Sequence, residues 1–296
     1  MGTIKKNLGF AYKKLQKNKI SSAFLDAELL LSFVLRKSRE YILAHPEKKL
    51  TKKQIIKFTD LIKQRVKHMP VAYLTNTKEF YGREFYVDKR VLVPRPETEM
   101  IIDVAKRATR NAQRVGDIID VGTGSGCIII TLIKELQNLK SKIKKLKFTA
   151  IDISKDALIV ARKNARLHNI DKKIKFLRGN LLEPFLKNKK LVIGYWSLVI
   201  TCNLPYLTPT QVKNSISIKH EPKLALTAGK DGLKYYRELT EQINLLQKQN
   251  PQIKITLLCE IDPAQIKGIK KIFSFAKNIK IKKDLAGRDR IVVVKL

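Results

Sequence analysis

The residues best suited to chemistry are the tetrad Asn203-Leu204-Pro205-Tyr206, which ends an apolar stretch that begins at Val199. A planar amide or amine nitrogen has a delocalised lone pair, so an enzyme that methylates it must fix its orientation. The Asn203 side-chain oxygen and the Leu204 carbonyl can accept hydrogen bonds from its two N–H groups. Pro205 would stiffen the turn, and the Tyr206 ring would pack on the planar group. The tetrad therefore predicts a substrate site for methyl transfer, with Asn203, Pro205 and Tyr206 as catalytic residues; an ordinary strand-end turn is the alternative.

A glycine-rich turn, Gly122-Thr123-Gly124-Ser125-Gly126, follows the apolar residues 117–121. Glycines at the mouth of a strand let the backbone approach a ligand closely. The turn lacks the Gly-Lys-Ser/Thr ending of a phosphate loop, and Cys127 and Ile129 break the Gly-x-Gly-x-x-Gly dinucleotide fingerprint. The remaining pattern, Asp-x-Gly-x-Gly-x-Gly, is typical of enzymes that use S-adenosylmethionine. It predicts cofactor contacts at all five residues of the turn.

Two later segments end in residues that suit an adenosine. Residues 147–152 finish with Asp152, whose carboxylate can accept hydrogen bonds from both ribose hydroxyls, although a simple helix cap is the alternative. Asn180 and Leu181 come after the third apolar segment, where they can bond an adenine edge and pack on its ring. We therefore expect an S-adenosylmethionine site that includes these three residues and reaches Asn203, with S-adenosylhomocysteine as the product.

The alternation of apolar segments predicts an α/β framework that positions these residues. Strands are predicted at 117–121, 147–152, 174–178, 195–202, 253–260, 278–284 and 290–295, and helices at 97–108, 126–138, 155–168, 231–249 and 262–276. Such alternation is typical of a mostly parallel, Rossmann-like sheet with helices on both faces. Only residues 285–289 separate the last two strands, too few for a crossover helix, so this pair should be antiparallel.

The residues before this framework have a different period. We predict a helical domain at 1–75, a β-hairpin linker at 76–94 whose pattern of period two ends in Val91, Leu92 and Val93, and a methyltransferase domain at 95–296. In the first domain Ser21-Ser22 and Thr51 are suited to cap two helices. Apolar residues at helical spacing should fill its core; among them are Phe24, Ala27, Leu30, Leu31 and Val34, together with Tyr12, Leu15, Tyr41 and Ile42.

Composition narrows the protein class. The formal net charge is +35, but it comes from 46 Lys and 15 Arg spread along the whole chain. This charge fits either a compositional bias of the source or a partner rich in phosphate or carboxylate. Such a partner could be RNA that is bound nonspecifically, or the ribosome if the protein acts near it. No apolar run approaches the roughly 20 residues of a membrane span, and the start lacks a signal-peptide core, so we expect a cytoplasmic protein. The three cysteines, Cys127, Cys202 and Cys259, are far apart in the sequence, which argues against a metal site. Each has apolar neighbours, so we expect buried free thiols.

The chain resembles the protein-(glutamine-N5) methyltransferases of peptide chain release factors, the HemK family. The most specific resemblance is Pro94-Arg95-Pro96-Glu97-Thr98-Glu99, and further matching segments are 70–74, 79–82, 91–93, 221–222, 225–226, 229–233, 236–237 and 283–290. The resemblance implies that the helical domain engages a class-1 release factor. It also implies that the larger domain binds S-adenosylmethionine and that the target is the glutamine of the factor's Gly-Gly-Gln loop. We expect the protein to be a monomer.

The chain departs from the family pattern at several positions. Leu204 replaces the first proline of Asn-Pro-Pro-Tyr, and Asn180 and Leu181 replace a usual acid and a common aromatic residue. Ser197 replaces an Asp, and Asn76 replaces a Gly. Asn-Leu-Pro-Tyr also occurs in ribosomal RNA adenine dimethyltransferases.

Two other functions therefore stay open. One is an adenine-N6 methyltransferase acting on RNA or DNA, which the tetrad and the charge favour. The other is a basic RNA-associated binding protein whose methyltransferase fold has lost activity. The Pro-Arg-Pro-Glu-Thr-Glu segment and the helical domain favour the release-factor enzyme over the first, and the complete set of site residues argues against the second.

Overall fold

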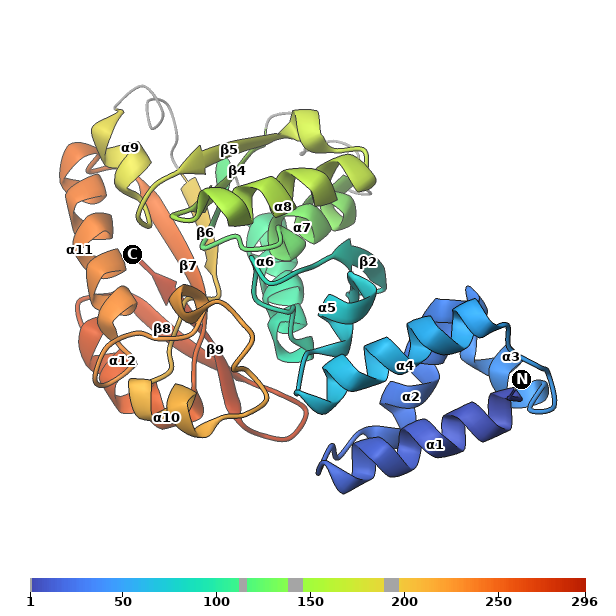
Figure 1. Cartoon of the computed structure of the whole chain (residues 1–296). Coiled ribbons are helices and arrows are strands. Elements are labelled where there is room, and N and C mark those ends of the chain that lie inside the picture. The colour runs from blue at the N-terminus through green and yellow to red at the C-terminus, as the bar shows by residue number, and fades with distance from the viewer. Residues whose placement is uncertain (1, 112–115, 138–145, 189–196) are drawn as a thin grey trace. The chain divides into compact units, whose positions relative to one another are not determined.

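The computed structural model describes residues 2–111, 116–137, 146–188 and 197–296 (Figure 1). The chain forms two compact units, one of residues 1–77 with 215–220 and the other of residues 78–214 with 221–296. Within the described ranges no helix is long and apolar enough to cross a membrane.

The smaller unit is built from short amphipathic helices. They are α1 (Ile4–Lys17), α2 (Ala23–Leu35), α3 (Arg39–Ala44), α4 (Lys52–Val66) and α5 (Val71–Thr75). Thr51 caps α4 in a capping box with Gln54, as its residue type predicts. Leu15, Leu30 and Ile62 are fully buried in one apolar cluster, so the helices share a small core.

Three details of this unit differ from the prediction. Ser22 precedes α2 but does not cap it; its hydroxyl donates instead to Asp26 Oδ2 at 2.8 Å. Phe24 is 56% exposed, contrary to the prediction. The buried face of α2 includes Ala23 and Ala27, and Phe24 lies beside this face. Tyr41 stacks its ring on His45, with centroids 4.2 Å apart, and is only half-buried.

The predicted hairpin consists of β1 (Thr77–Phe80) and β2 (Arg83–Tyr86). Its turn residues Tyr81 and Gly82 both have positive φ, 53° and 68°, as a type I′ turn requires. Residues 91–93, which fall within the predicted hairpin linker, belong to neither strand of the hairpin; Val91 and Val93 are buried in the larger unit. A 3₁₀ turn, η1 (Pro96–Thr98), then leads into α6 (Glu99–Asn111), close to the predicted helix.

The described part of the larger unit contains a seven-stranded sheet in the order β5-β4-β3-β6-β7-β9-β8. The strands are β3 (Asp117–Val121), β4 (Lys147–Asp152), β5 (Ile174–Arg178), β6 (Ser197–Cys202), β7 (Lys254–Glu260), β8 (Asn278–Lys283) and β9 (Asp289–Lys295). The first five are parallel, and β9 is antiparallel to both β7 and β8, which confirms the predicted sheet. Positions 195–196 of the predicted fourth strand, and 138 of a predicted helix, lie outside the described residues.

Helices cover both faces of this sheet (Figure 1). With α6, the helices α7 (Cys127–Gln137) and α8 (Lys155–Leu167) cover one face. The other face carries α9 (Glu183–Lys187), α11 (Lys234–Gln249) and α12 (Ile266–Ile272). Ile118 and Ile119 belong to the cores on opposite faces, as do Val199 and Ile200, because successive side chains of a strand alternate. The short helices α9 and α10 (Pro209–Asn214) were not predicted.

Winding of the sheet reverses at β3, which has β4 on one side and β6 on the other. Ligands of such sheets bind beyond the carboxyl ends of the strands at this point. The glycine turn follows β3, Asp152 ends β4, and the tetrad follows β6. The sheet order therefore brings the predicted site residues to one edge.

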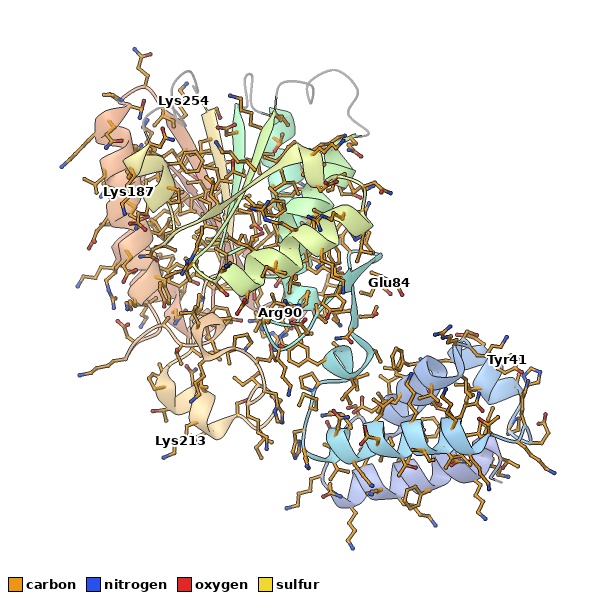
Figure 2. All side chains as sticks on the ribbon, turned by 45° about the horizontal axis from the view of Figure 1, so that its top comes forward. Tyr41, Glu84, Arg90, Lys187, Lys213 and Lys254 are labelled. Carbon is orange, nitrogen blue, oxygen red and sulfur yellow. The ribbon has the colours of Figure 1, made fainter. Side chains whose placement is uncertain are left out.

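The positions of the lysines and cysteines agree with what the sequence predicts. Lys187, Lys213 and Lys254 are exposed and come from three separate elements of the larger unit (Figure 2). The three cysteines are buried and free, as predicted. The labelled lysines thus place positive charge around this unit and not on a single element.

Candidate active site

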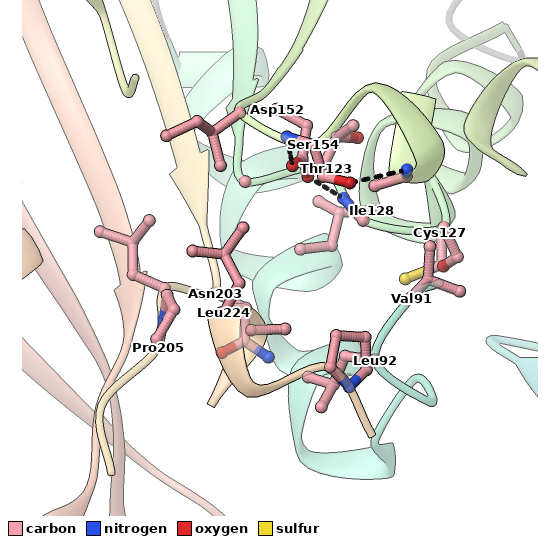
Figure 3. A pocket seen from close by; sticks show the side chains of 18 of the residues that line it. Val91, Leu92, Thr123, Cys127, Ile128, Asp152, Ser154, Asn203, Pro205 and Leu224 are labelled. Atoms are coloured by element: carbon pink, nitrogen blue, oxygen red, sulfur yellow. Dashed lines mark hydrogen bonds between the residues drawn. The ribbon is translucent and has the colours of Figure 1, made fainter. Parts of the chain in front are cut away.

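A pocket opens at the carboxyl ends of β3, β4 and β6 (Figure 3). Of the predicted site residues its lining includes Gly122, Thr123, Gly124, Ser125, Asp152, Asn180, Leu181, Asn203, Leu204 and Pro205. Figure 3 shows Asp152 and Ser154 on one side of the pocket and Asn203 and Pro205 on another. Gly126 and Tyr206 do not belong to this lining.

The glycine turn presents bare backbone to the pocket. Gly122 and Gly124 have φ values of 69° and 54°, a region that side-chain-bearing residues rarely adopt. A Cβ added at Gly124 would meet no atom closer than the Gly122 carbonyl oxygen at 4.0 Å. The N–H groups of Gly122 and Thr123 both donate to the Ile151 carbonyl, at 2.9 and 3.0 Å. The turn is thus fixed to β4 while its outer side stays open to a ligand.

Gly126 has a different part in the structure. Its φ is 81°, and a Cβ there would lie 3.0 Å from Ile130 Cδ1 and 3.3 Å from Ala161 Cβ. Gly126 therefore permits close packing of α7 against α8, and not a backbone wall for the pocket.

Asp152 joins the glycine turn to the start of α8. Its Oδ2 accepts from the Gly124 N–H, and its Oδ1 from the Ser154 N–H, both at 2.9 Å (Figure 3). Ser154, and not Asp152, caps α8, because its hydroxyl oxygen accepts from the Ala157 N–H at 3.1 Å. Burial raises the pKa of Asp152, and these backbone donors oppose the rise. Each carboxylate oxygen has a further lone pair, so Asp152 can still accept from ligand hydroxyls.

Asn180 and Leu181 form the wall beyond β5. The Asn180 amide donates to Glu238 Oε2 on α11, at 3.5 Å, and its backbone N–H donates to Glu183 Oε2 at 3.3 Å. Leu181 is buried in the pocket wall with a φ of 53°, a left-handed conformation that is uncommon for leucine. Such strain is characteristic of residues whose backbone is held in place by a site.

A hydrogen-bonded chain orients Asn203. The Asn203 Nδ2 donates to the Thr98 hydroxyl oxygen at 2.9 Å, and the Thr98 hydroxyl donates to Glu260 Oε2 at 2.6 Å. Thr98 has one hydroxyl proton. Because Thr98 donates this proton in its hydrogen bond to Glu260, its oxygen can only accept a hydrogen bond from Asn203. The NH₂ side of Asn203 therefore faces Thr98, and its carbonyl oxygen is the amide atom left for a ligand.

The other tetrad residues support this arrangement. Leu204 is buried, and its Cδ2 would lie 3.5 Å from a Cβ added at Gly122, so the two turns pack together. The Tyr206 hydroxyl donates to Glu260 Oε1 at 3.3 Å, and its backbone carbonyl accepts from Gln265 Nε2 at 2.8 Å. Burial raises the pKa of Tyr206, which keeps the phenol protonated.

The segment 94–99 supplies polar contacts to its surroundings. Arg95 forms an ion pair with buried Glu221, which also accepts from the Val93 N–H at 3.1 Å. Glu99 accepts from the Tyr81 N–H at 2.8 Å. With Thr98 on Asn203, this segment links the hairpin to the tetrad. Thr98 and Glu260 were missed as site residues; the signal was an acid at the end of the strand beside β6.

Two family models match the chain: the PrmC N-terminal domain at residues 8–75 and a methyltransferase domain at residues 114–209. A bifunctional methyltransferase of Rickettsia felis is 35% identical over 98% of this chain, which spans 58% of that relative's length. A solved structure with the same fold is the hMettl16 catalytic domain in complex with the MAT2A 3′UTR hairpin 6. Its TM-score is 0.52 at 15% identity, over 83% of this chain and 81% of that one.

Two relatives of similar length match over most of both chains. The release factor glutamine methyltransferase of Bacillus cereus is 33% identical over 91% of this chain and 91% of its own. That of Dictyoglomus turgidum is 36% identical over 92% of this chain and 91% of its own. With the switch-point pocket, the methyltransferase fold and the helical unit in place, this likeness decides the classification: the chain belongs to the release factor glutamine methyltransferase family.

Proposed function

We propose that this protein methylates the side-chain amide nitrogen, N5, of the glutamine in the Gly-Gly-Gln loop of class-1 release factors, with S-adenosylmethionine as methyl donor. The observation that carries the proposal is the orientation of Asn203, whose NH₂ group is held by Thr98. An amide carbonyl left free in the pocket accepts an N–H donor. A glutamine NH₂ group has two such donors, and the Leu204 carbonyl can take the second.

The pocket residues fit S-adenosylmethionine. The bare backbone at Gly122 and Gly124 admits close contact, Asp152 has lone pairs for two ribose hydroxyls, and Leu181 offers an apolar surface for an adenine ring. The bound cofactor would supply an electrophilic methyl group on a sulfonium; its methyl–sulfur bond would break as the bond to nitrogen forms, S-adenosylhomocysteine would leave, and the nitrogen would lose one N–H proton to solvent. No metal is needed for displacement of this kind by a nitrogen.

The protein's part in the reaction is to hold the nucleophile. Two acceptors on the two N–H groups fix the plane of the substrate amide, which aims the nitrogen lone pair out of that plane. The same oxygens stabilise the positive character that the nitrogen gains as its bond to carbon forms. Pro205 restricts the turn that carries both acceptors.

The helical unit is proposed to engage the release factor, so residues 1–75 would be the substrate-recognition domain. Its match to the PrmC N-terminal domain supports this role, and the pocket-lining residues all belong to the larger unit. A chain of residues 78–296 that folds should still bind the cofactor but methylate an intact release factor poorly. Full activity of this shortened chain on the whole factor would remove the recognition role. A substrate that acts in translation also favours a cytoplasmic location.

One labelling experiment tests the proposed function. The protein is incubated with methyl-labelled S-adenosylmethionine and, separately, with a release factor, its Gln→Ala variant in the Gly-Gly-Gln loop, and ribosomal RNA. The proposal predicts label only in the unchanged release factor. Label in the Gln→Ala factor would place the target elsewhere on the protein, and label in RNA would favour an adenine methyltransferase.

A further inference from the structure

Glu260 is a buried acid behind the pocket, outside the pocket lining. It ends β7, next to β6, and is 1% exposed. Its Oε2 accepts from Thr98 at 2.6 Å and its Oε1 from Tyr206 at 3.3 Å. Its backbone carbonyl also accepts from the Tyr236 hydroxyl at 2.6 Å. A buried carboxylate is costly, so hydrogen bonds to both of its oxygens are needed to retain it.

The charge of Glu260 determines which way Thr98 donates. An ionised carboxylate only accepts, so both hydroxyls must donate to it, and the Thr98 oxygen is left to accept from the Asn203 NH₂ group. A protonated carboxyl can donate to Thr98 instead. The Thr98 proton is then free to donate to the Asn203 carbonyl, and the Asn203 amide can turn its NH₂ group toward the pocket.

We propose that Glu260 and Thr98 are positioning residues that set the orientation of the Asn203 amide, so that its carbonyl oxygen faces the acceptor nitrogen. The inference rests on the methyl transfer proposed above. The orientation of the Asn203 amide would select the class of acceptor. In the observed orientation the Asn203 carbonyl can accept from a nitrogen with two N–H groups, whereas a turned amide would place its own N–H groups against that nitrogen.

The surroundings of Glu260 give this chain of hydrogen bonds a pH dependence. Burial raises the pKa of Glu260, while Thr98, Tyr206 and Arg290 lower it. The other facing groups are Glu97 on η1, Cys202 on β6 and Tyr236 on α11. The carboxylate is lost as pH falls through the raised pKa. Turnover should therefore decline toward acid at a pH above the usual range of a glutamate.

Thr98→Val tests the inference most cleanly, because valine keeps the shape of threonine and removes the hydroxyl. By analogy with the loss of a hydrogen-bond partner that orients a metal ligand, it should lower kcat by about 10–100-fold, with the cofactor Kd retained. Thr98→Ser restores the hydroxyl and should recover most of the turnover. Thr109→Val is the matched control: the buried Thr109 hydroxyl donates to Ala105 O within α6, at 2.8 Å, and Thr109 does not line the pocket.

Two readouts separate positioning from general damage. The decline of kcat toward acid pH should disappear in both Glu260→Gln and Thr98→Val. Glutamine does not titrate, and without the Thr98 hydroxyl the protonation of Glu260 no longer affects Asn203. In protein with ¹⁵N-labelled asparagine, the Asn203 side-chain signal is assigned by its loss in Asn203→Ala. Its amide protons should exchange slowly in the parent and in Thr98→Ser, and rapidly in Thr98→Val.

The outcomes also separate this inference from the proposed function. If the parent methylates no release factor, the proposed function fails, and the Asn203 amide signal still decides whether Thr98 holds it. If Thr98→Val turns over as fast as Thr98→Ser, or its Asn203 amide protons exchange as slowly, the inference is overturned. An acid decline that persists unchanged in Glu260→Gln would overturn the part assigned to Glu260.

Discussion

The two ends of the pocket are built in different ways. At the cofactor end, Gly122, Gly124 and Asp152 belong to consecutive strand–turn units; the Gly122 N–H donates to the Ile151 carbonyl, and the Gly124 N–H donates to the Asp152 carboxylate. At the tetrad end, Asn203 is oriented by Thr98 and Glu260, which come from distant parts of the chain. The residues of the first end could be recognised from local sequence, whereas the partners of Asn203 are apparent only in the completed sheet. A substitution at one end should therefore leave the other end's task intact.

The largest effect is expected for Asn203→Ala. Loss of its oxygen removes an acceptor that both orients the substrate amide and stabilises charge on its nitrogen. By analogy with removal of one oxyanion-hole group, kcat should fall by about 10²–10³-fold, or about 2.7–4 kcal/mol. Single-turnover rates on a release factor at saturating cofactor measure this effect. An unchanged rate would mean that the tetrad does not hold the nucleophile.

Asp152→Ala should act on the cofactor. Its carboxylate fixes the Gly124 N–H and offers lone pairs to ribose hydroxyls. Removing hydrogen bonds to a charged group should weaken S-adenosylmethionine binding by about 1.5–3 kcal/mol. Calorimetric titration gives this value directly, and unchanged affinity would reduce Asp152 to a structural link between the turn and α8.

The glycine turn itself should divide between stability and binding. Gly126→Ala combines a φ of 81° with a 3.0 Å approach to Ile130 Cδ1, so it should destabilise the fold by about 1–3 kcal/mol. Gly124→Ala has open space for its methyl group, so only its φ of 54° costs stability, and the variant should chiefly weaken cofactor binding. Thermal unfolding of the two variants without cofactor compares them; a larger loss of stability in Gly124→Ala would reverse the assignment.

Leu204→Pro should have the smallest effect. It restores the residue usual in the Asn-Pro-Pro-Tyr pattern and keeps the backbone carbonyl proposed to bind the substrate. Turnover should stay close to that of the parent, with a small loss of packing against Gly122. A dead Leu204→Pro variant beside an active Asn203→Ala variant would contradict the proposed use of the tetrad.

The strands could be predicted from the sequence because buried strands are apolar runs, and because glycines or polar residues follow them at the turns. The seven strands, the antiparallel last pair and the clustering of the glycine turn with Asp152 and Asn203 all follow from it. Phe24 and Tyr41 were wrongly predicted as core residues, because the exposure of a side chain depends on which neighbours pack against it. The partnership of Thr98 with Glu260 has no local signal, since it forms only when β7 lies beside β6 and η1 packs at their ends.

The most direct test of the two-ended pocket measures Asn203→Ala and Asp152→Ala side by side. For each variant and the parent, the cofactor Kd is determined by calorimetry and the single-turnover rate on a release factor at saturating cofactor. The account predicts a crossed result: Asn203→Ala loses the rate by about 10²–10³-fold and keeps the Kd, whereas Asp152→Ala loses affinity and keeps most of the rate. If each variant loses rate and affinity in equal measure, the two ends do not have separate tasks and the account is contradicted.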